Sequence, residues 1–191
     1  MLAGGRAARL GGQAKPQLDV GGRTMLAAVL AACAGATARV VVGPPQPVAD
    51  GVLVLREQPP GGGPVAAMRA GLAVVRTDVV AVLAGDLPFV TAGVLGELLE
   101  QLTDDGALVV DDAGRDQFLL GVWRTAALRA AVTSTPGHAP VRRVLAPLTV
   151  RRVRPAVAPG SAPPWLDCDT PADLTRARAQ AARFPPEGRQ G

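Results

Sequence analysis

Short apolar runs recur along the first half of the chain and alternate with segments of helical periodicity. The runs are continuous rather than alternating with polar residues, which is typical of strands in a parallel sheet covered on both faces. Four runs therefore predict buried strands: RVVVG (39–43), GVLVL (51–55), VVAVLAG (79–85) and ALVVD (107–111).

The segments between these runs have the spacing of amphipathic helices. Thr24 and Thr91 are suited to N-caps, and Pro64 is suited to a first helical turn. The predicted helices cover about 24–35, 64–76 and 91–102. This alternation of strands and helices predicts an open, doubly wound α/β fold with a mostly parallel sheet. Such folds bind ligands at the carboxyl ends of their strands, so the loops there are the first candidates for function.

The second half of the chain is less regular. QFLLGVW (117–123) predicts a strand, RTAALRAAV (124–132) a helix, and a further strand is expected near 148–153. The segment from Trp165 is expected to begin as a short strand and to continue as a helix capped by Thr170. We expect a single domain over 1–183 and a disordered tail over 184–191.

Composition limits the classes of protein that the chain can belong to. With 191 residues, of which 48% are hydrophobic, it can bury one sizeable core. No apolar run approaches the ~18 residues of a membrane span, and the opening residues lack a signal-peptide core, so we expect a cytoplasmic protein with no membrane partner. Cys33 and Cys168 have no metal-ligand spacing and are expected to be small buried hydrophobes.

The distribution of charged residues draws attention to a single lysine. The net charge is +4, but the cations are scattered and no basic helix with interleaved aromatics occurs, so we expect no nucleic-acid partner. Of the 20 Lys and Arg residues, Lys15 is the only lysine. A compact ammonium in a chain otherwise supplied with guanidinium groups indicates a specific requirement at this position.

Lys15 falls within a glycine-rich stretch, LAGGRAARLGGQAKPQL, that follows Met1 directly. Gly4 and Gly5 come after what can be only a short strand, and their backbone N–H groups can approach an anion closely. Arg6, Arg9 and Lys15 add positive charge to the same segment. A solvated terminus would have a similar composition, but the position after a strand and the single lysine favour a phosphate-binding loop.

Three further segments carry candidate chemistry. Asp86 ends the strand at 79–85, where a carboxylate can hold Mg²⁺ against phosphates or can simply begin a turn. The loop in EQPPGGGPVAAM (57–68) can approach a flat or phosphorylated ligand, and the following helix directs its positive end the same way. In LDCDTPADL, one of Asp167 and Asp169 can share a metal with Asp86.

Together these motifs resemble the signatures of the MobA-like nucleotidyltransferases. LAGGRAARLGGQAK is similar to their L-A-G-G-x-[SA]-x-R-[ML]-G-x-x-K segment, and GDLPF to their Asp-x-Pro turn. EQPPGGGPVAAM is similar to their D-x-x-P-G-x-G-P-L-A-G segment, and DCDTPADL to their N/D-x-N/D-T-P-E-D-L motif. The motifs occur in the family's order, which implies a Rossmann-like nucleotidyltransferase fold.

The resemblance also implies a reaction and a site. It implies transfer of GMP from GTP to the terminal phosphate of molybdopterin, with Mg²⁺ as cofactor and pyrophosphate as product. Lys15, Arg9 and Asp86 would be catalytic, and Asp86 and Asp169 would hold the metal. Glu57 occupies the position of a nucleotide-contacting aspartate, and Gly43 that of a base-contacting asparagine. The implied nucleotide-binding residues are Leu2, Ala3, Gly4, Gly5, Arg6, Lys15, Gly43, Glu57, Gly63 and Asp86.

Three functions remain open at this point. The first is guanylyl transfer to molybdopterin, with transient contacts to other proteins of molybdenum cofactor synthesis. The second is a cytidylyltransferase, or a transferase for a sugar or lactate phosphate, of the same fold. The third is a nucleotide-binding homologue with little activity. No general base is required, and His138 and the pair Arg142 and Arg143 are interpreted as solvated side chains.

Overall fold

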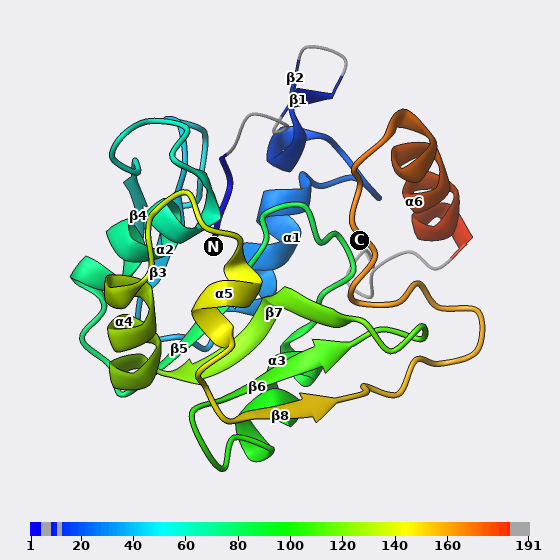
Figure 1. Ribbon diagram of the computed structural model, residues 1–191. Coiled ribbons are helices and arrows are strands. Elements are labelled where there is room, and N and C mark those ends of the chain that lie inside the picture. The colour runs from blue at the N-terminus through cyan, green and yellow to red at the C-terminus, as the bar shows by residue number, and fades with distance from the viewer. Residues whose placement is uncertain (5–8, 11–12, 184–191) are drawn as a thin grey trace.

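The computed structural model describes residues 1–4, 9–10 and 13–183, with only the backbone for residues 9, 10 and 13 (Figure 1). The predicted tail over 184–191 lies outside the described residues. Among the described residues, no helix combines the length and apolar character needed to cross a membrane. The strands are β1 (Arg9–Leu10), β2 (Gln13–Ala14), β3 (Arg39–Val42), β4 (Val52–Leu55), β5 (Val79–Leu83), β6 (Gly106–Val110), β7 (Asp116–Arg124) and β8 (Val150–Val153). The helices are η1 (Lys15–Gln17), α1 (Met25–Ala32), α2 (Gly63–Val74), α3 (Ala92–Glu100), α4 (Thr125–Ser134), α5 (Val141–Leu145) and α6 (Pro171–Arg183).

The first residues of the chain lie at the centre of the sheet. β3 pairs in parallel with β4, and β5, β7, β6 and β8 pair in that order. Met1–Ala3 joins the two groups, because Leu2 bridges in parallel to both Val42 and Ala84. The Leu2 amide donates to the Leu83 carbonyl at 2.8 Å, and the Ala3 amide donates to the Val42 carbonyl at 2.8 Å. The expected short first strand is thus present, and its carboxyl end leads directly into the glycine-rich loop.

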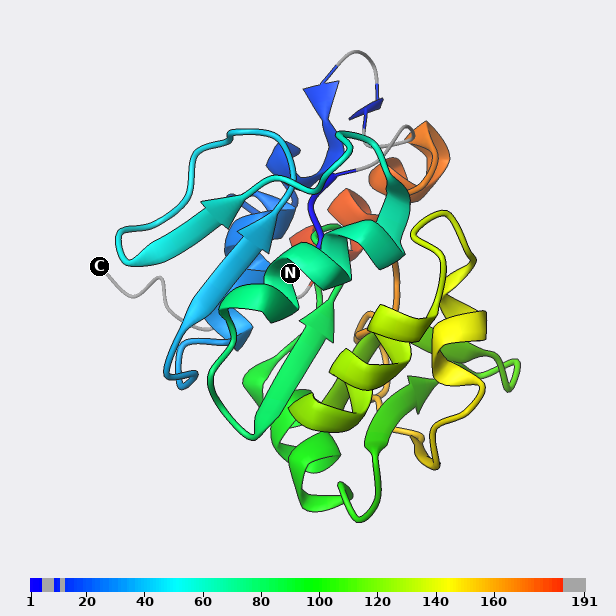
Figure 2. The same ribbon diagram turned by 60° about the vertical axis from the view of Figure 1, so that its left-hand side comes forward.

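Helices cover both faces of this mixed sheet, as the continuous apolar runs predicted (Figures 1 and 2). One core cluster joins α1 and α3 to strand residues such as Leu83 and Val109. Another joins α2, α4 and α5 to Val82 and Leu108, whose side chains point to the opposite face because side chains alternate along a strand. The doubly wound α/β fold is confirmed. β7 runs antiparallel to both β5 and β6, and it is the only antiparallel strand of this sheet in the described residues.

Local signals located most elements. Thr24 Oγ1 accepts a hydrogen bond from the Ala27 amide at 3.1 Å, and Thr91 Oγ1 accepts one from the Val94 amide at 3.4 Å, so both predicted N-caps are confirmed. The short strand expected from Trp165 was wrong. The described chain from Trp165 to Asp169 pairs with no strand and is held instead by the buried Cys168 side chain, which packs with Leu174 and Ala177 of α6.

Candidate functional site

A pocket of about 170 Å³ lies at the carboxyl edge of the central strands. Its walls come from segments far apart in the sequence: the end of Met1–Ala3, η1, the loop before α2, the end of β5, β7, and the segment before α6. The lining residues are Leu2, Ala3, Gly4, Lys15, Pro16, Glu57, Gly63, Pro64, Ala67, Ala84, Gly85, Asp86, Leu119 and Asp169. This is the edge at which doubly wound sheets bind ligands.

Two glycines allow the strands beneath the pocket to pack closely. A Cβ atom on Gly43 would lie 2.7 Å from the Ala3 carbonyl oxygen, and one on Gly85 would lie 3.1 Å from the Leu2 carbonyl oxygen. A Cβ atom at Gly43 would require the backbone to shift, and one at Gly85 would make a contact tighter than nearly all that real Cβ atoms make. Ala3 and Gly4 are therefore held tightly between the ends of β3 and β5, and both residues line the pocket.

Lys15 is buried in the pocket wall, and its side chain is directed by an ion pair. The residue is only 5% exposed, although it begins the short helix η1. Its Nζ donates to Asp169 Oδ1 at 2.6 Å across a sequence separation of 154 residues. The Asp169 side chain is 66% exposed, so the ion pair joins a buried ammonium to a carboxylate that is accessible to solvent. A buried ammonium beside an open carboxylate is suited to an anionic ligand.

Asp86 also lines the pocket, and its pKa is affected by the charges of both Lys15 and Asp169. Burial raises the pKa of its carboxyl above the usual range, and Asp169 raises it further, whereas the Lys15 ammonium and the residue's own amide lower it. The balance is a raised pKa. Burial therefore leaves the Asp86 carboxylate poorly solvated, and a bound cation would stabilise its charged form.

The segment before α6 adds to this acidic character. Asp167 and Asp169 are exposed on either side of the buried Cys168. Burial raises the pKa of Asp167, with further contributions from Asp169 and Asp86. Burial and nearby carboxylates raise the pKa of Cys168 to about 12, so its thiol stays protonated at neutral pH. Thr170 Oγ1 accepts from the Asp173 amide at 3.1 Å, which confirms the predicted cap and fixes the segment to α6.

Glu57 is a buried acid with one occupied oxygen. It is 5% exposed, and its Oε1 accepts a hydrogen bond from the Gly61 amide at 2.9 Å, which closes the loop before α2. Its Oε2 is buried and has no hydrogen-bond partner among the residues that the structure describes. Because an unpaired buried acceptor is costly, this oxygen is available for a donor on a ligand. Gly61 and Gly63 have φ values of 75° and 86°, so the glycines of this loop are required by its backbone.

Most residues implied by the sequence motifs meet in this pocket. Those that line it are Leu2, Ala3, Gly4, Lys15, Glu57, Gly63, Asp86 and Asp169. Gly43 lies behind Ala3 instead of in the wall. Gly5 and Arg6 lie outside the described residues, and Arg9 is described only through its backbone in β1. Their predicted roles remain predictions.

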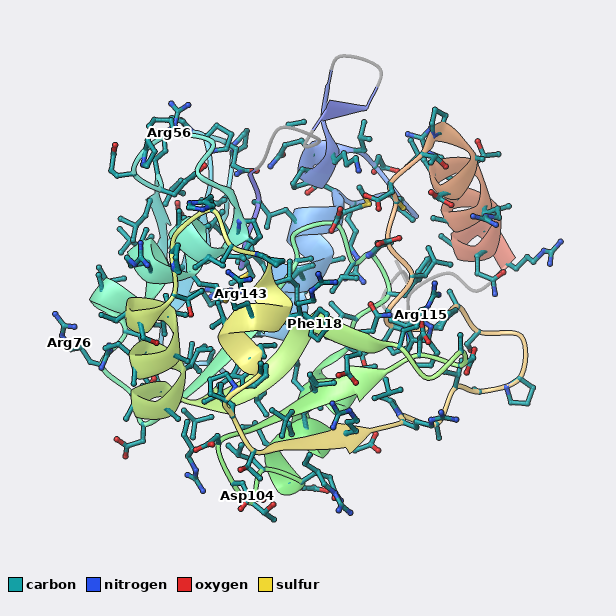
Figure 3. All side chains as sticks on the ribbon, in the orientation of Figure 1. Arg56, Arg76, Asp104, Arg115, Phe118 and Arg143 are labelled. Atoms are coloured by element: carbon teal, nitrogen blue, oxygen red, sulfur yellow. The ribbon has the colours of Figure 1, made fainter. Side chains whose placement is uncertain are left out.

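Sequence reasoning did not identify every lining residue. Ala67 of α2, Ala84 at the end of β5, and Leu119 of β7 also contact the pocket. Each is an apolar residue within a periodic run, and nothing in the sequence separates it from the core residues on either side. Arg142 and Arg143 are exposed on α5, as expected of a solvated helix face, and Arg143 is labelled in Figure 3.

Comparisons with known proteins agree with this arrangement. Residues 1–154 match the model of the MobA-like NTP transferase domain. The chain is 30% identical, over 95% of its length and 92% of the relative's, to a molybdenum cofactor guanylyltransferase of Bradyrhizobium sp. (strain ORS 278).

Solved structures share the fold at low identity. The 2-C-methyl-D-erythritol 4-phosphate cytidylyltransferase of Thermus thermophilus has a TM-score of 0.68 and 23% identity, with 88% of this chain and 94% of that chain covered. A nucleotidyl transferase from Methanothermobacter has a TM-score of 0.73 and 19% identity, with 95% of each chain covered.

Proposed function

The chain belongs to the MobA-like NTP transferase family, and we propose that it transfers the GMP unit of GTP to the terminal phosphate of molybdopterin. In this reaction an oxygen of the acceptor phosphate forms a bond to the α-phosphorus of GTP. The bond between the α-phosphorus and its bridging oxygen breaks, and pyrophosphate leaves. The Bradyrhizobium relative is named a molybdenum cofactor guanylyltransferase, and this name supports the choice of donor and acceptor.

One observation carries the proposal: the buried Lys15 ammonium and the carboxylates of Asp86 and Asp169 line the same small pocket. Nucleotidyl transfer requires positive charge on the triphosphate and a way to hold it in line with the acceptor. Because the acceptor phosphate is already anionic, no side chain has to remove a proton from it. His138 is not among the residues that line the pocket, in keeping with a reaction that needs no general base.

The carboxylates fit Mg²⁺. This ion prefers oxygen ligands and commonly keeps several waters beside one or two carboxylates. Asp86 and Asp169 supply two carboxylates, and within residues 1–4, 9–10 and 13–183 there is no cluster of three or more ligating side chains that would suit a fully protein-built cage. We propose that both residues hold Mg²⁺, which would supply charge neutralisation on the phosphates of GTP.

Lys15 would bind the α-phosphate and favour departure of pyrophosphate. The ion pair with Asp169 already orients the Lys15 ammonium, so the side chain needs little rearrangement when a phosphate binds. The backbone amide of Gly4 would contribute a neutral donor to the same phosphates. Arg6 and Arg9 would add charge from the glycine-rich loop.

Glu57 would recognise the base. Its unpartnered Oε2 is an acceptor only, and the N1–H and N2 amino groups of guanine are donors on one edge of the base. A hydrogen bond to a buried carboxylate is among the stronger contacts available to a ligand.

Cytidylyl transfer is the second candidate. The observation that favours it is Gly43, which stands where an asparagine contacts the base in the resembled family and leaves no side chain for that contact. Its Cβ position is filled by the Ala3 backbone, so base selection must come from elsewhere. A nucleotide-binding homologue with little activity would bind GTP without turnover.

Nucleotide binding distinguishes these candidates. Thermal unfolding would be followed with GTP, CTP, ATP and UTP, each with Mg²⁺, on the wild-type chain and on Asp86→Ala. We expect stabilisation by GTP alone, and a smaller shift in the variant. Stabilisation by CTP alone would support the second candidate. Stabilisation by GTP with no pyrophosphate release on addition of molybdopterin would support the third.

A further inference from the structure

The last helix packs on an apolar cluster of its own. The buried residues of α6 pack with apolar residues of the segment that runs from η1 to the start of α1. In the described part of the chain, this cluster shares no buried residue with the two clusters that cover the faces of the sheet. Figure 1 shows α6 at the side of the molecule, beside the segment that follows η1. Residues 166–183, here called the clasp, are thus attached mainly to residues 15–25.

The clasp begins where the chain leaves the main core. Trp165 packs against the cluster that joins α1 and α3 to the sheet, whereas Leu166 packs against the cluster of α6. The preceding residues, 154–164, are all described and form no helix or strand. Because two adjacent residues have different packing partners at this point, the clasp can leave its position while the sheet stays folded.

Little apolar surface holds the clasp in place. The residues that α6 buries are one leucine, Leu174, and two alanines, Ala177 and Ala181. An alanine side chain removes little apolar area from water, so these contacts contribute only modestly to stability. The Arg178 Nε donates to the Asp19 carbonyl at 3.0 Å, and the arginine side chain is exposed. A segment held by so few buried apolar side chains opens at a lower free energy than the whole chain unfolds.

One ion pair joins the clasp to the candidate site. Lys15 Nζ contacts Asp169 Oδ1 at 2.6 Å, and both residues line the pocket. Asp169 belongs to the clasp, whereas Lys15 belongs to the segment on which the clasp packs. Opening of the clasp would therefore break the pair, remove Asp169 from the pocket wall and uncover the buried ammonium.

We propose that the clasp opens as a unit, with the Lys15–Asp169 ion pair as its latch, and that anionic ligands reach and leave Lys15 through this opening. The inference rests on the proposed function only in taking a phosphate as the ligand of Lys15. A closed clasp holds the ammonium in position for the ligand, and an open clasp gives the ligand a way out of the pocket.

The carboxylates of the clasp decide how an anion affects the latch. Burial raises the pKa of Asp167, and Asp169 and Asp86 raise it further, so negative groups already lie close together here. An anion that binds Lys15 without a cation shares the ammonium with Asp169 and adds negative charge beside it. Such a ligand should weaken the latch and favour the open clasp.

This coupling must be reciprocal. If pyrophosphate without a metal ion favours the open clasp, a substitution that weakens the packing of the clasp must strengthen the binding of pyrophosphate. Leu174→Ala is such a substitution, because Leu174 is the one large apolar side chain that α6 buries. A residue with a merely structural role would not tighten the binding of a ligand when it is truncated.

Native-state hydrogen exchange on the full chain tests the latch. We expect Lys15→Met to speed exchange of the α6 amides, such as Ala177, by at least ~10-fold and to change that of sheet amides, such as Val122, much less. Arg152→Met is the matched control, since it removes the ion pair with Asp116 on β8, and it should leave the α6 amides unchanged. Equal acceleration in α6 and in the sheet, or none in α6, would overturn the proposal.

Titration with pyrophosphate in the presence of EDTA tests the coupling. We expect pyrophosphate to speed exchange of the α6 amides in the wild-type chain, and Leu174→Ala to bind pyrophosphate at least ~3-fold more tightly than wild type. Leu145→Ala, which truncates a leucine of similar burial on α5, should bind it like wild type.

The outcomes separate the clasp from the proposed activity. Pyrophosphate that binds without speeding exchange in α6, or that binds Leu174→Ala no more tightly than wild type, would overturn the proposal and leave the proposed activity intact. A wild-type chain that does not bind pyrophosphate would count against the proposed phosphate contact of Lys15, and with it against the coupling.

Discussion

Asp86 is the residue at which stability and the proposed activity would make opposite demands. Its pKa is raised chiefly by burial, so the folded chain holds a proton there more tightly than the unfolded chain. Ionised Asp86 therefore lowers stability at every pH above its folded pKa, and this penalty fades as the pH falls through that value.

We expect Asp86→Asn to raise Tm at neutral pH and to lower the rate of GMP transfer by at least ~10³-fold, because the amide neither carries the buried charge nor replaces a carboxylate ligand. The Tm advantage of the variant should shrink on acidification. Calorimetry between neutral and acidic pH, together with product analysis, checks both parts. A variant that is less stable than wild type at neutral pH, or that transfers GMP normally, would contradict the assignment.

We expect even a conservative replacement of Lys15 to lower the proposed activity. It is buried and its ammonium contacts Asp169 at 2.6 Å, a space that a planar guanidinium does not fit. Lys15→Arg should lower kcat/KM by about 10²-fold or more, since a misplaced charge no longer meets the α-phosphate. Arg151→Lys, an exposed change on β8, is the matched control and should have little effect. A Lys15→Arg enzyme within a few-fold of wild type would show that a compact ammonium is not required.

A substitution at Glu57 tests its proposed role in recognition of the base. In Glu57→Gln the amide oxygen can still accept from Gly61, but an N–H donor replaces the free acceptor and faces the donors of guanine. GTP affinity should fall by about 10- to 100-fold, the equivalent of one charged hydrogen bond. CTP affinity, measured by the same titration, should change less. Glu100→Gln on the exposed end of α3 is the control. Unchanged GTP affinity would place base recognition elsewhere.

At the scale of elements, the site depends on how closely β3 and β5 hold the Met1–Ala3 strand. The Gly43 Cβ position meets the Ala3 carbonyl oxygen at 2.7 Å, and backbone on both sides prevents either partner from yielding. The geometry of the pocket floor is therefore set by a glycine that does not itself line the pocket.

Gly43→Ala should destabilise the fold by about 1–3 kcal/mol and weaken nucleotide binding, because Ala3 and Gly4 must shift. Denaturant unfolding and GTP titration measure the two effects. Gly96→Ala adds the same methyl group in open space on a helix and should be neutral or stabilising. If Gly43→Ala matched wild type in both measurements, the close approach would have no functional consequence.

Across the whole molecule, the sequence predicted which residues meet in one pocket better than it predicted the order and direction of the strands. Residues such as Gly4, Glu57 and Asp86 follow separate strands, and the carboxyl ends of parallel strands meet at one edge, so local patterns were enough to bring them together. The antiparallel direction of β7 and its insertion between β5 and β6 depend on long-range packing, which periodicity does not encode.

The side-chain contacts within the candidate site could not be predicted from the sequence either. Nothing in the sequence near Lys15 indicates that it pairs with a residue 154 positions away. Nothing near Glu57 indicates that one oxygen accepts from Gly61 while the other has no partner in the described part of the chain. The short strand expected from Trp165 failed because burial of Cys168 against α6, instead of strand pairing, holds that segment. Such facts follow from the packed fold.

Turnover decides between the three functions at once. The full chain would be incubated with molybdopterin, Mg²⁺ and each of GTP, CTP, ATP and UTP, and pyrophosphate release and the mass of the pterin product would be recorded. We expect pyrophosphate with GTP alone and a product heavier by one GMP unit. Pyrophosphate with CTP but not GTP, or none with any nucleotide, would contradict guanylyl transfer.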